Sequence, residues 1–217
     1  MIEVTYIDHM GSDLSVVNAA RVSFGKKSDW LPRIHNGEAK ALSAKDCRLI
    51  AYLARHNHKS PFNHTFTTFH VKAPVFVARQ LVKHEYMPWN EISRRYVDEE
   101  PEFYTPINWR GRSEDKKQGS SGEIFTDVSP NYAYTAARET YRNLLMDGVA
   151  PEQARMVLPQ SMMTEWYWSG TVFSFAKMCS LRCKDDTQAE TRVVADAIDE
   201  EMENLYPMSW ESLREYM

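Results

Sequence analysis

Glycine is scarce in this chain of 217 residues: it has 8, and none falls in a dinucleotide-binding or phosphate-loop pattern. The three cysteines (Cys47, Cys179 and Cys183) are an odd number and too few for a disulfide scaffold. No segment approaches the roughly 18 apolar residues that span a bilayer, and the first residues lack a signal-peptide pattern. We therefore expect a cytoplasmic protein with no membrane partner, and no Rossmann or P-loop nucleotide site.

The chain also lacks an excess of positive charge. Its 26 Lys and Arg residues face 30 Asp and Glu residues, a net charge of -4, which argues against a general nucleic-acid partner. Hydrophobic residues make up 43% and aromatic residues 12%, enough for a sizeable core. The length predicts a single domain over residues 1–217, or one subunit of a compact oligomer.

Hydrophobic periodicity predicts both helices and strands. Alternation of apolar and polar residues indicates a strand over 1–8, and the β-branched and aromatic residues of 65–71 indicate a second one. The aromatic stretch 162–171 is compatible with a strand or a helix, and we favour a strand. Helical spacing indicates helices over 43–56, 75–83, 130–148, 172–182 and 188–206, with a short helix from Pro151. Pro74 is expected as the first residue of its helix, and Pro61 disfavours helix at Ser60. The polar stretch 108–127 is expected to be an exposed loop. Strands and helices without regular βαβ alternation predict an α+β fold, an antiparallel sheet flanked by helices.

Histidine and cysteine do not form a metal motif. Five of the seven histidines lie between His56 and His84, but no HExxH or CxxC pattern accompanies them. Cys179 and Cys183 are four residues apart on a predicted helix, where packing is the better interpretation. A thiolate nucleophile beside Arg182 stays open as a weaker one. We predict no metal site.

Residues 79–96 carry the densest chemistry, with three arginines, a lysine, a histidine, carboxylates, an amide and aromatic rings. Such a mixture suits a planar anionic ligand, because arginine binds phosphate and rings stack on a base. The alternative is a solvated charged turn. Arg79 and Gln80 belong to an otherwise apolar helix, which favours a ligand as their partner.

The same residues resemble the flavin-dependent thymidylate synthases. The resemblance is carried by the runs at 60–85 and 90–96, Glu102-Phe-Tyr, Ala19 to Gly25 and Ala154 to Pro159, and it spans nearly the whole chain. That family's signature is Arg-His-Arg followed after seven residues by Ser. Here Lys83-His84-Glu85 and Ser93 keep the spacing without the two arginines. The resemblance implies that family's fold.

The resemblance implies a binding site for dUMP at Gln80, Lys83, Glu91, Ile92, Ser93, Arg94, Arg95, Arg155 and Arg182. Arg182 is the implied catalytic residue, because a cation beside the uracil ring stabilises the charge that develops there. The alternative role for Arg182 is compensation of a helix C-terminus, worth only ~0.3–1 kcal/mol.

The resemblance also implies a binding site for FAD at His58, Ser60, Lys83, His84, Glu85, Glu91, Thr171, Phe173 and Lys177. Several of these depart from the family pattern: Lys83 and Glu85 replace arginines, and Thr171, Phe173 and Lys177 replace Asn, Arg and Asn. Arg to Glu at 85 reverses a charge, and a unit charge pair at 4 Å is worth about 4 kcal/mol at an effective dielectric of 20. Lys83 and Lys177 partly restore the positive field without arginine's planar fork.

The implied reaction converts dUMP to dTMP, with methylenetetrahydrofolate as carbon donor, FAD as cofactor and NADPH as reductant. The implied assembly is a homotetramer with active sites between subunits. Two alternatives remain open because the flavin side is altered: hydroxymethylation of the pyrimidine at C5, or a catalytically silent nucleotide-binding protein.

Overall fold

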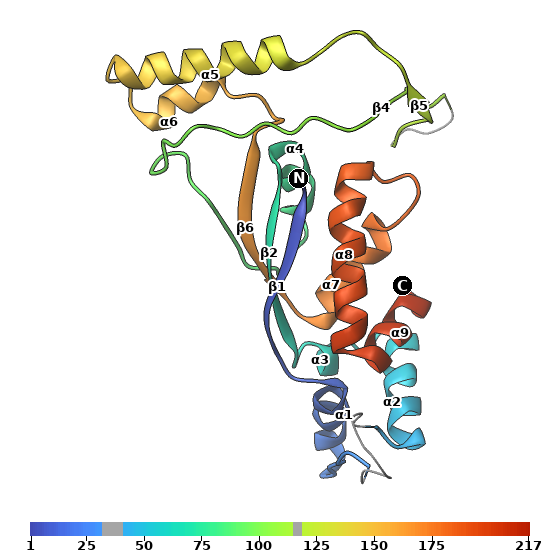
Figure 1. Cartoon of the computed structure of the whole chain (residues 1–217). Coiled ribbons are helices and arrows are strands. Elements are labelled where there is room, and N and C mark those ends of the chain that lie inside the picture. The colour runs from blue at the N-terminus through green and yellow to red at the C-terminus, as the bar shows by residue number, and fades with distance from the viewer. Residues whose placement is uncertain (32–40, 115–118) are drawn as a thin grey trace, which may run out of the picture.

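An antiparallel sheet forms the centre of the molecule (Figure 1). The computed structural model describes residues 1–31, 41–114 and 119–217. The strands are β1 (Glu3–Met10), β2 (Phe66–Pro74), β6 (Met163–Gly170) and β3 (Trp89–Glu91), in the order β1-β2-β6-β3, and all neighbours are antiparallel. The predicted α+β class is confirmed.

Helices cover one side of this sheet and both of its ends (Figure 1). Beside the sheet lie α4 (Val75–Leu81), α7 (Val172–Arg182) and α8 (Ala189–Leu205), with α9 (Pro207–Tyr216) following α8. One end carries α1 (Asp13–Arg21), a 3₁₀ turn (Val22–Phe24), α2 (Ala44–Arg55) and α3 (Lys59–Phe62). The other end carries α5 (Asn131–Met146), α6 (Pro151–Ala154) and a 3₁₀ turn (Arg155–Val157). In the described residues, no helix is long and apolar enough to cross a membrane.

The core lies between the sheet and α7. Alternate side chains of β2 are buried, and Phe69 packs edge-on against Phe175 of α7 with ring centroids 5.2 Å apart. Trp168 of β6 also packs edge-on against Phe175, at 5.4 Å. Burying a side chain of this size stabilises the fold by about 1.5–3 kcal/mol, so α7 is held firmly against the sheet.

Local sequence signals decide several boundaries. The Ser43 side chain accepts the Asp46 backbone N–H at 3.2 Å and begins α2, as predicted. Gly148, with φ 83°, follows the end of α5, because its left-handed conformation ends a helix at little cost. The strand predicted over 162–171 is confirmed as β6.

Two proline predictions were wrong. Pro61 lies inside α3, although it was expected to exclude helix at Ser60. The helix has only four residues, so Pro61 sits in its first turn, where no intrahelical N–H is needed. Pro74 is the last residue of β2 and the cap of α4 rather than the first helical residue, and α4 ends at Leu81 rather than at Lys83.

The described residues of the stretch 108–127 are mostly exposed, and they carry a short ladder of β4 (Trp109–Arg110) and β5 (Glu123–Ile124). Arg110 donates to the buried carboxylate of Glu190 at 2.6 Å, in the first turn of α8. Burial acts to raise the pKa of Glu190, but the hydrogen bond and charge of Arg110, together with further hydrogen bonds from the start of α8, hold the pKa below its usual value. The ion pair tethers this segment to the body of the protein.

Candidate active site

A cavity of about 650 Å³ lies between α3, the segment after α4, and α7. We call it the lysine cavity. Its lining comprises Lys59, Asn63, Lys83, His84, Glu85, Tyr86, Met87, Thr171, Phe173, Ser174, Lys177, Leu181 and Arg182. Seven of the expected nucleotide and flavin residues meet here: Lys83, His84, Glu85, Thr171, Phe173, Lys177 and Arg182.

The walls of the lysine cavity are fixed by close packing and hydrogen bonds. Thr171 caps α7 by accepting the Ser174 N–H at 3.2 Å, and its hydroxyl donates to the Asn63 side chain at 3.0 Å. The segment after α4 lies close to the end of β6, because a Cβ added at Gly170 would come within 2.9 Å of the Met87 methyl group. The cavity therefore has a preformed shape on three elements.

Arg182 is positioned by a neutral histidine. Its Nε–H donates to His84 Nε2 at 3.2 Å, which requires Nε2 to be the unprotonated nitrogen. Burial, with the positive charges of Arg182 and Lys177, lowers the pKa of His84 to about 4. His84 thus stays uncharged at neutral pH and can accept from Arg182, directing the guanidinium into the cavity.

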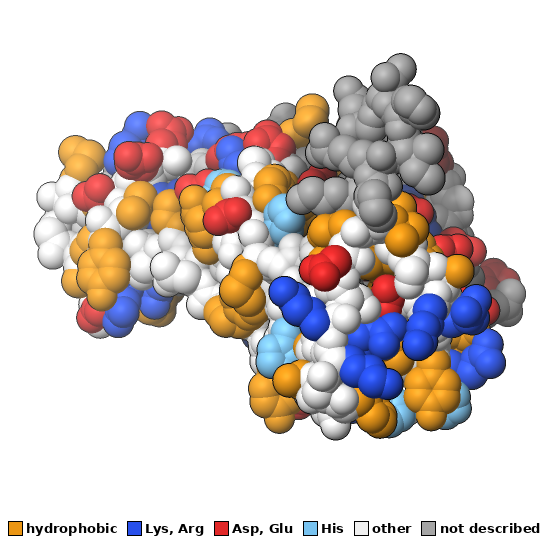
Figure 2. Space-filling model, turned by 90° about the horizontal axis from the view of Figure 1, so that it is seen from below, with side chains coloured by type: hydrophobic (Ala, Val, Ile, Leu, Met, Phe, Trp, Pro, Cys, Tyr) orange, Lys and Arg blue, Asp and Glu red, His pale blue; other side chains and the backbone are white. Residues whose placement is uncertain are grey.

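Positive charge dominates the lysine cavity. Four cationic side chains line it, Lys59, Lys83, Lys177 and Arg182, against the single carboxylate of Glu85. Among the residues that the structure describes, none of these five groups makes an ion pair within 4.0 Å. The face seen in Figure 2, at the end that carries α1 to α3, likewise gathers Lys and Arg side chains. A chain of net charge -4 thus builds a local site for an anion.

A second cavity, of about 460 Å³, lies at the other end of β6. We call it the arginine cavity, after Arg79, Arg94 and Arg155. Its lining comprises Val75, Arg79, Glu91, Ile92, Arg94, Glu152, Arg155, Met156, Leu158, Pro159, Gln160, Met162, Met163 and Thr164. Four of the expected nucleotide residues meet here: Glu91, Ile92, Arg94 and Arg155.

The Glu91 carboxylate is held at the arginine cavity from two sides. It accepts the Thr164 hydroxyl at 2.7 Å and the Trp89 indole N–H at 3.1 Å. Arg94 donates to the backbone carbonyl of Glu99, and Arg155 Nε donates to the backbone carbonyl of Glu152 at 3.2 Å. Three arginines around one fixed carboxylate suit a ligand that carries both a phosphate and hydrogen-bonding edges.

Five expected residues line neither cavity. Gln80 donates to the Gln188 side chain at 2.5 Å, next to α8. Arg95 lies over the ring of its neighbour Tyr96, 5.2 Å from the ring centroid, and the Arg95 backbone N–H donates to Ser93. His58 and Ser60 lie at α3, where the His58 ring is 6.0 Å from that of Tyr52.

The two cavities are well separated within one chain. Thr164 near the start of β6 lines the arginine cavity, and Thr171 directly after β6 lines the lysine cavity. Seven residues separate these positions, and at ~3.4 Å per residue they are about 24 Å apart along the strand. Residues expected to bind one nucleotide, Arg155 and Arg182, are therefore not brought together by a single subunit.

Sequence reasoning missed Lys59 and Asn63 in the lysine cavity. Lys59 is the first residue of α3 and Asn63 directly follows it, and the sequence did not predict this helix. Their signal was their closeness to His58 and Ser60, which the resemblance had already placed near the flavin. Arg79 had been noted as a cation in an apolar helix, and the structure places it in the arginine cavity.

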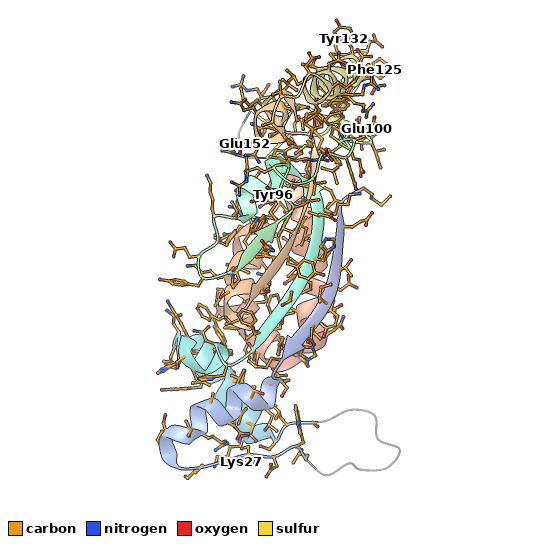
Figure 3. All side chains as sticks on the ribbon, turned by 90° about the vertical axis from the view of Figure 1, so that its left-hand side faces the viewer. Lys27, Tyr96, Glu100, Phe125, Tyr132 and Glu152 are labelled. Carbon is orange, nitrogen blue, oxygen red and sulfur yellow. The ribbon has the colours of Figure 1, made fainter. Side chains whose placement is uncertain are left out.

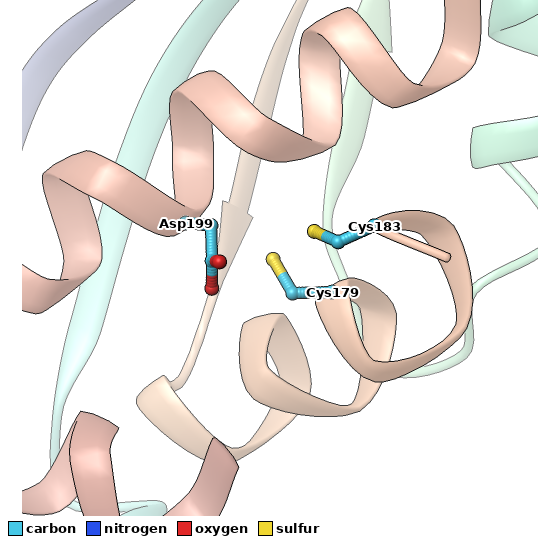
Figure 4. Close-up of side chains that lie close together, drawn as sticks. All are labelled: Cys179, Cys183 and Asp199. Carbon is cyan, nitrogen blue, oxygen red and sulfur yellow. The ribbon is translucent and has the colours of Figure 1, made fainter. Parts of the chain in front are cut away.

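Among the described residues, Cys179, Cys183 and Asp199 form the group close enough to share a metal ion, with ligand atoms within 4.8 Å of one another (Figure 4). Asp199, however, accepts the Trp210 indole N–H at 3.0 Å and pairs with Arg214 at 2.9 Å. Burial raises the pKa of the Cys179 thiol well above its usual value. A protonated thiol and a carboxylate already paired with an arginine favour helix packing over a metal centre.

Comparisons with known proteins agree with each other. A family model described as thymidylate synthase complementing protein matches residues 5–208. A flavin-dependent thymidylate synthase of Thermus thermophilus is 38% identical over 217 residues, covering 99% of this chain and 76% of the relative. One of Thermotoga neapolitana is 39% identical over 214 residues, covering 98% and 91%.

The fold is similar to that of a solved enzyme. The crystal structure of the UMP/dUMP methylase PolB from Streptomyces cacaoi, bound with 5-Br dUMP, has a TM-score of 0.82 and 31% sequence identity. The similarity covers 100% of this chain and 96% of the other. A second structure of that methylase, bound with 5-Br UMP, gives a TM-score of 0.83.

Proposed function

The chain belongs to the family of flavin-dependent thymidylate synthases, and we propose that it converts dUMP to dTMP with FAD, methylenetetrahydrofolate and NADPH. The observation that carries the proposal is Arg182, held by the neutral His84 in a cavity whose cations form no ion pair with a carboxylate of the described residues. Two findings support it: the relatives are named flavin-dependent thymidylate synthases, and the similarly folded PolB is described as a UMP/dUMP methylase.

The residues of the lysine cavity fit a flavin cofactor. Its volume of about 650 Å³ lies in the range of small-molecule sites, and its surplus of positive charge suits a cofactor with two phosphates. The Phe173 ring offers an apolar contact for a planar ring system, and Lys83 and Lys177 offer charge in place of arginine. Bound FAD supplies the hydride-transfer chemistry between NADPH and the transferred carbon.

The chain's own residues bind and polarise the nucleotide. Carbon 5 of dUMP loses a proton and gains a methyl group. Methylenetetrahydrofolate would give the carbon and leave as tetrahydrofolate, and a hydride from NADPH, which becomes NADP+, would reduce it. The Arg182 guanidinium stabilises negative charge that develops on the uracil ring as C5 attacks. Glu91, fixed by Thr164 and Trp89, accepts hydrogen bonds from the nucleotide, while Arg155 and Arg94 pair with its phosphate.

A complete site takes residues from more than one copy of the chain. The support is the separation of about 24 Å along β6 between Thr164 of the arginine cavity and Thr171 of the lysine cavity. The projecting end of the molecule also carries exposed aromatic side chains: Phe125 is 90% and Tyr132 is 87% exposed, and both lie at the end opposite Lys27 (Figure 3). Such surfaces are typical of subunit contacts. We propose the homotetramer that the family resemblance implies.

Product analysis tests the function. The purified protein is incubated with dUMP, FAD, methylenetetrahydrofolate and NADPH, and the nucleotides are identified by mass spectrometry. The expected product is dTMP. Hydroxymethyl-dUMP identifies the alternative C5 hydroxymethylase, and tight dUMP binding without turnover identifies a silent nucleotide-binding protein. A parallel incubation with UMP shows whether the 2′-hydroxyl is accepted, as it is in the structure of PolB with 5-Br UMP.

A further inference from the structure

Lys59 holds its charge in the lysine cavity without an acidic partner. Its Nζ lies 5.6 Å from the centroid of the Phe173 ring, in the range of a cation–π contact. Such a contact positions an ammonium group but leaves its charge unneutralised. In the described part of the chain, Lys59 makes no ion pair with a carboxylate within 4.0 Å, although Glu85 lines the same cavity.

The three lysines of the cavity come from three separate elements. Lys59 begins α3, Lys83 follows α4, and Lys177 lies on α7, and all three side chains are exposed. Like charges that share a cavity repel one another, and a bound anion lowers this repulsion. Arg182 differs from the three lysines because its side chain has a hydrogen-bond partner, His84.

The spread of the charges favours a diphosphate over a single phosphate. A diphosphate presents two charged groups over a longer span than a single phosphate, so it can contact cations that come from several elements. We propose that Lys59, seated on Phe173, is a positioning residue that binds the diphosphate of the flavin cofactor together with Lys83 and Lys177. The inference rests on the proposed function only for the identity of the cofactor.

Phe173 lies between Lys59 and the cavity: its ring contacts the Lys59 ammonium group, and the residue also lines the cavity. A positive group at either position 59 or position 173 satisfies the same anion. The two positions should therefore depend on each other: Lys59 becomes dispensable once residue 173 carries its own positive charge.

The experiment compares three ligands on the full-length protein: FAD, riboflavin and inorganic pyrophosphate. Lys59→Ala should weaken FAD and pyrophosphate about tenfold by calorimetry or flavin fluorescence, while riboflavin, which has no phosphate, changes less than twofold. Lys59→Arg should restore binding. Lys45→Ala, an exposed lysine of α2 outside the cavity, is the matched control and should change none of the three affinities. Circular dichroism and the Tm of each variant check that it is folded.

The coupling is tested by Phe173→Arg. In that background, Lys59→Ala should cost less than twofold in FAD affinity. Equal losses for FAD and riboflavin in Lys59→Ala, or a full tenfold loss in the Phe173→Arg background, overturn the inference while leaving the proposed function intact. Pyrophosphate binding that depends on Lys59 in a protein that takes up no FAD supports the anion site and overturns the proposed cofactor instead.

Discussion

The neutral state of His84 makes a prediction about stability at low pH. The folded-state pKa is about 4, lowered by burial and by Arg182 and Lys177, while an unfolded histidine titrates near 6.5. Below pH 6.5 the unfolded chain binds a proton at His84, whereas the folded chain binds it only below about pH 4. Stability is therefore lost as pH falls through this window, and it is regained above pH 6.5.

The size of the effect follows from the shift. At pH 4.5 the difference between the two pKa values corresponds to a loss of about 2.5 kcal/mol in the free energy of unfolding. Because the ring is partly in contact with solvent, we expect a loss of about 1–1.5 kcal/mol. His84→Gln keeps an acceptor for Arg182 but cannot titrate. Between pH 7.5 and 4.5, wild type should lose about 1–1.5 kcal/mol more than His84→Gln in urea denaturation. His64→Gln, an exposed histidine, is the control and should follow wild type. Equal losses for wild type and His84→Gln would refute the assignment.

Three further changes test the scaffold and the nucleotide side. Asp46→Asn removes a buried ion pair with Arg21 at 2.5 Å and should lower the free energy of unfolding by about 2–4 kcal/mol in urea; a change under 0.5 kcal/mol contradicts it. Gly170→Ala pushes a methyl group against Met87 and should cost about 1–3 kcal/mol, seen as a lower Tm; an unchanged Tm shows that the segment after α4 adjusts freely. Arg155→Ala should weaken dUMP at least tenfold by calorimetry, the loss expected of a charged hydrogen bond of about 1.5–3 kcal/mol, without changing FAD affinity; equal loss of both ligands speaks against separate cavities.

Much of the fold follows from local signals in the sequence. Three signals act within a few residues and are confirmed by the structure: the Ser43 cap, the β-branched and aromatic run of β2, and Gly148 after α5. The elements that were missed are short or depend on distant packing. Strand β3 has three residues, too few to show a period, and it exists because Trp89 to Glu91 pair with β6. Helix α3 was missed because packing against α1 and α7 overrides the preference of a residue before proline.

In the candidate site, too, the residues of one contiguous motif could be predicted, whereas contacts between distant segments could not. The motif around Lys83 and His84 is contiguous, so the sequence could predict its members together. The family resemblance assigned Arg182 to the nucleotide and His84 to the flavin. The hydrogen bond between them was not predicted, because it joins segments that are far apart in the sequence. Lys59 was missed because its role depends on Phe173, which lies far along the chain. The side-chain direction of Gln80, toward Gln188, is set by helix packing and has no signature in the sequence.

Release of tritium from dUMP labelled at C5 tests the central claim most directly, because only chemistry at that carbon frees the label. With FAD, methylenetetrahydrofolate and NADPH present, the protein should release one tritium for each dTMP formed, and Arg182→Ala should release none while remaining folded. Lys45→Ala should match wild type. No release by the wild-type protein loaded with FAD, or undiminished release by Arg182→Ala, would contradict the account.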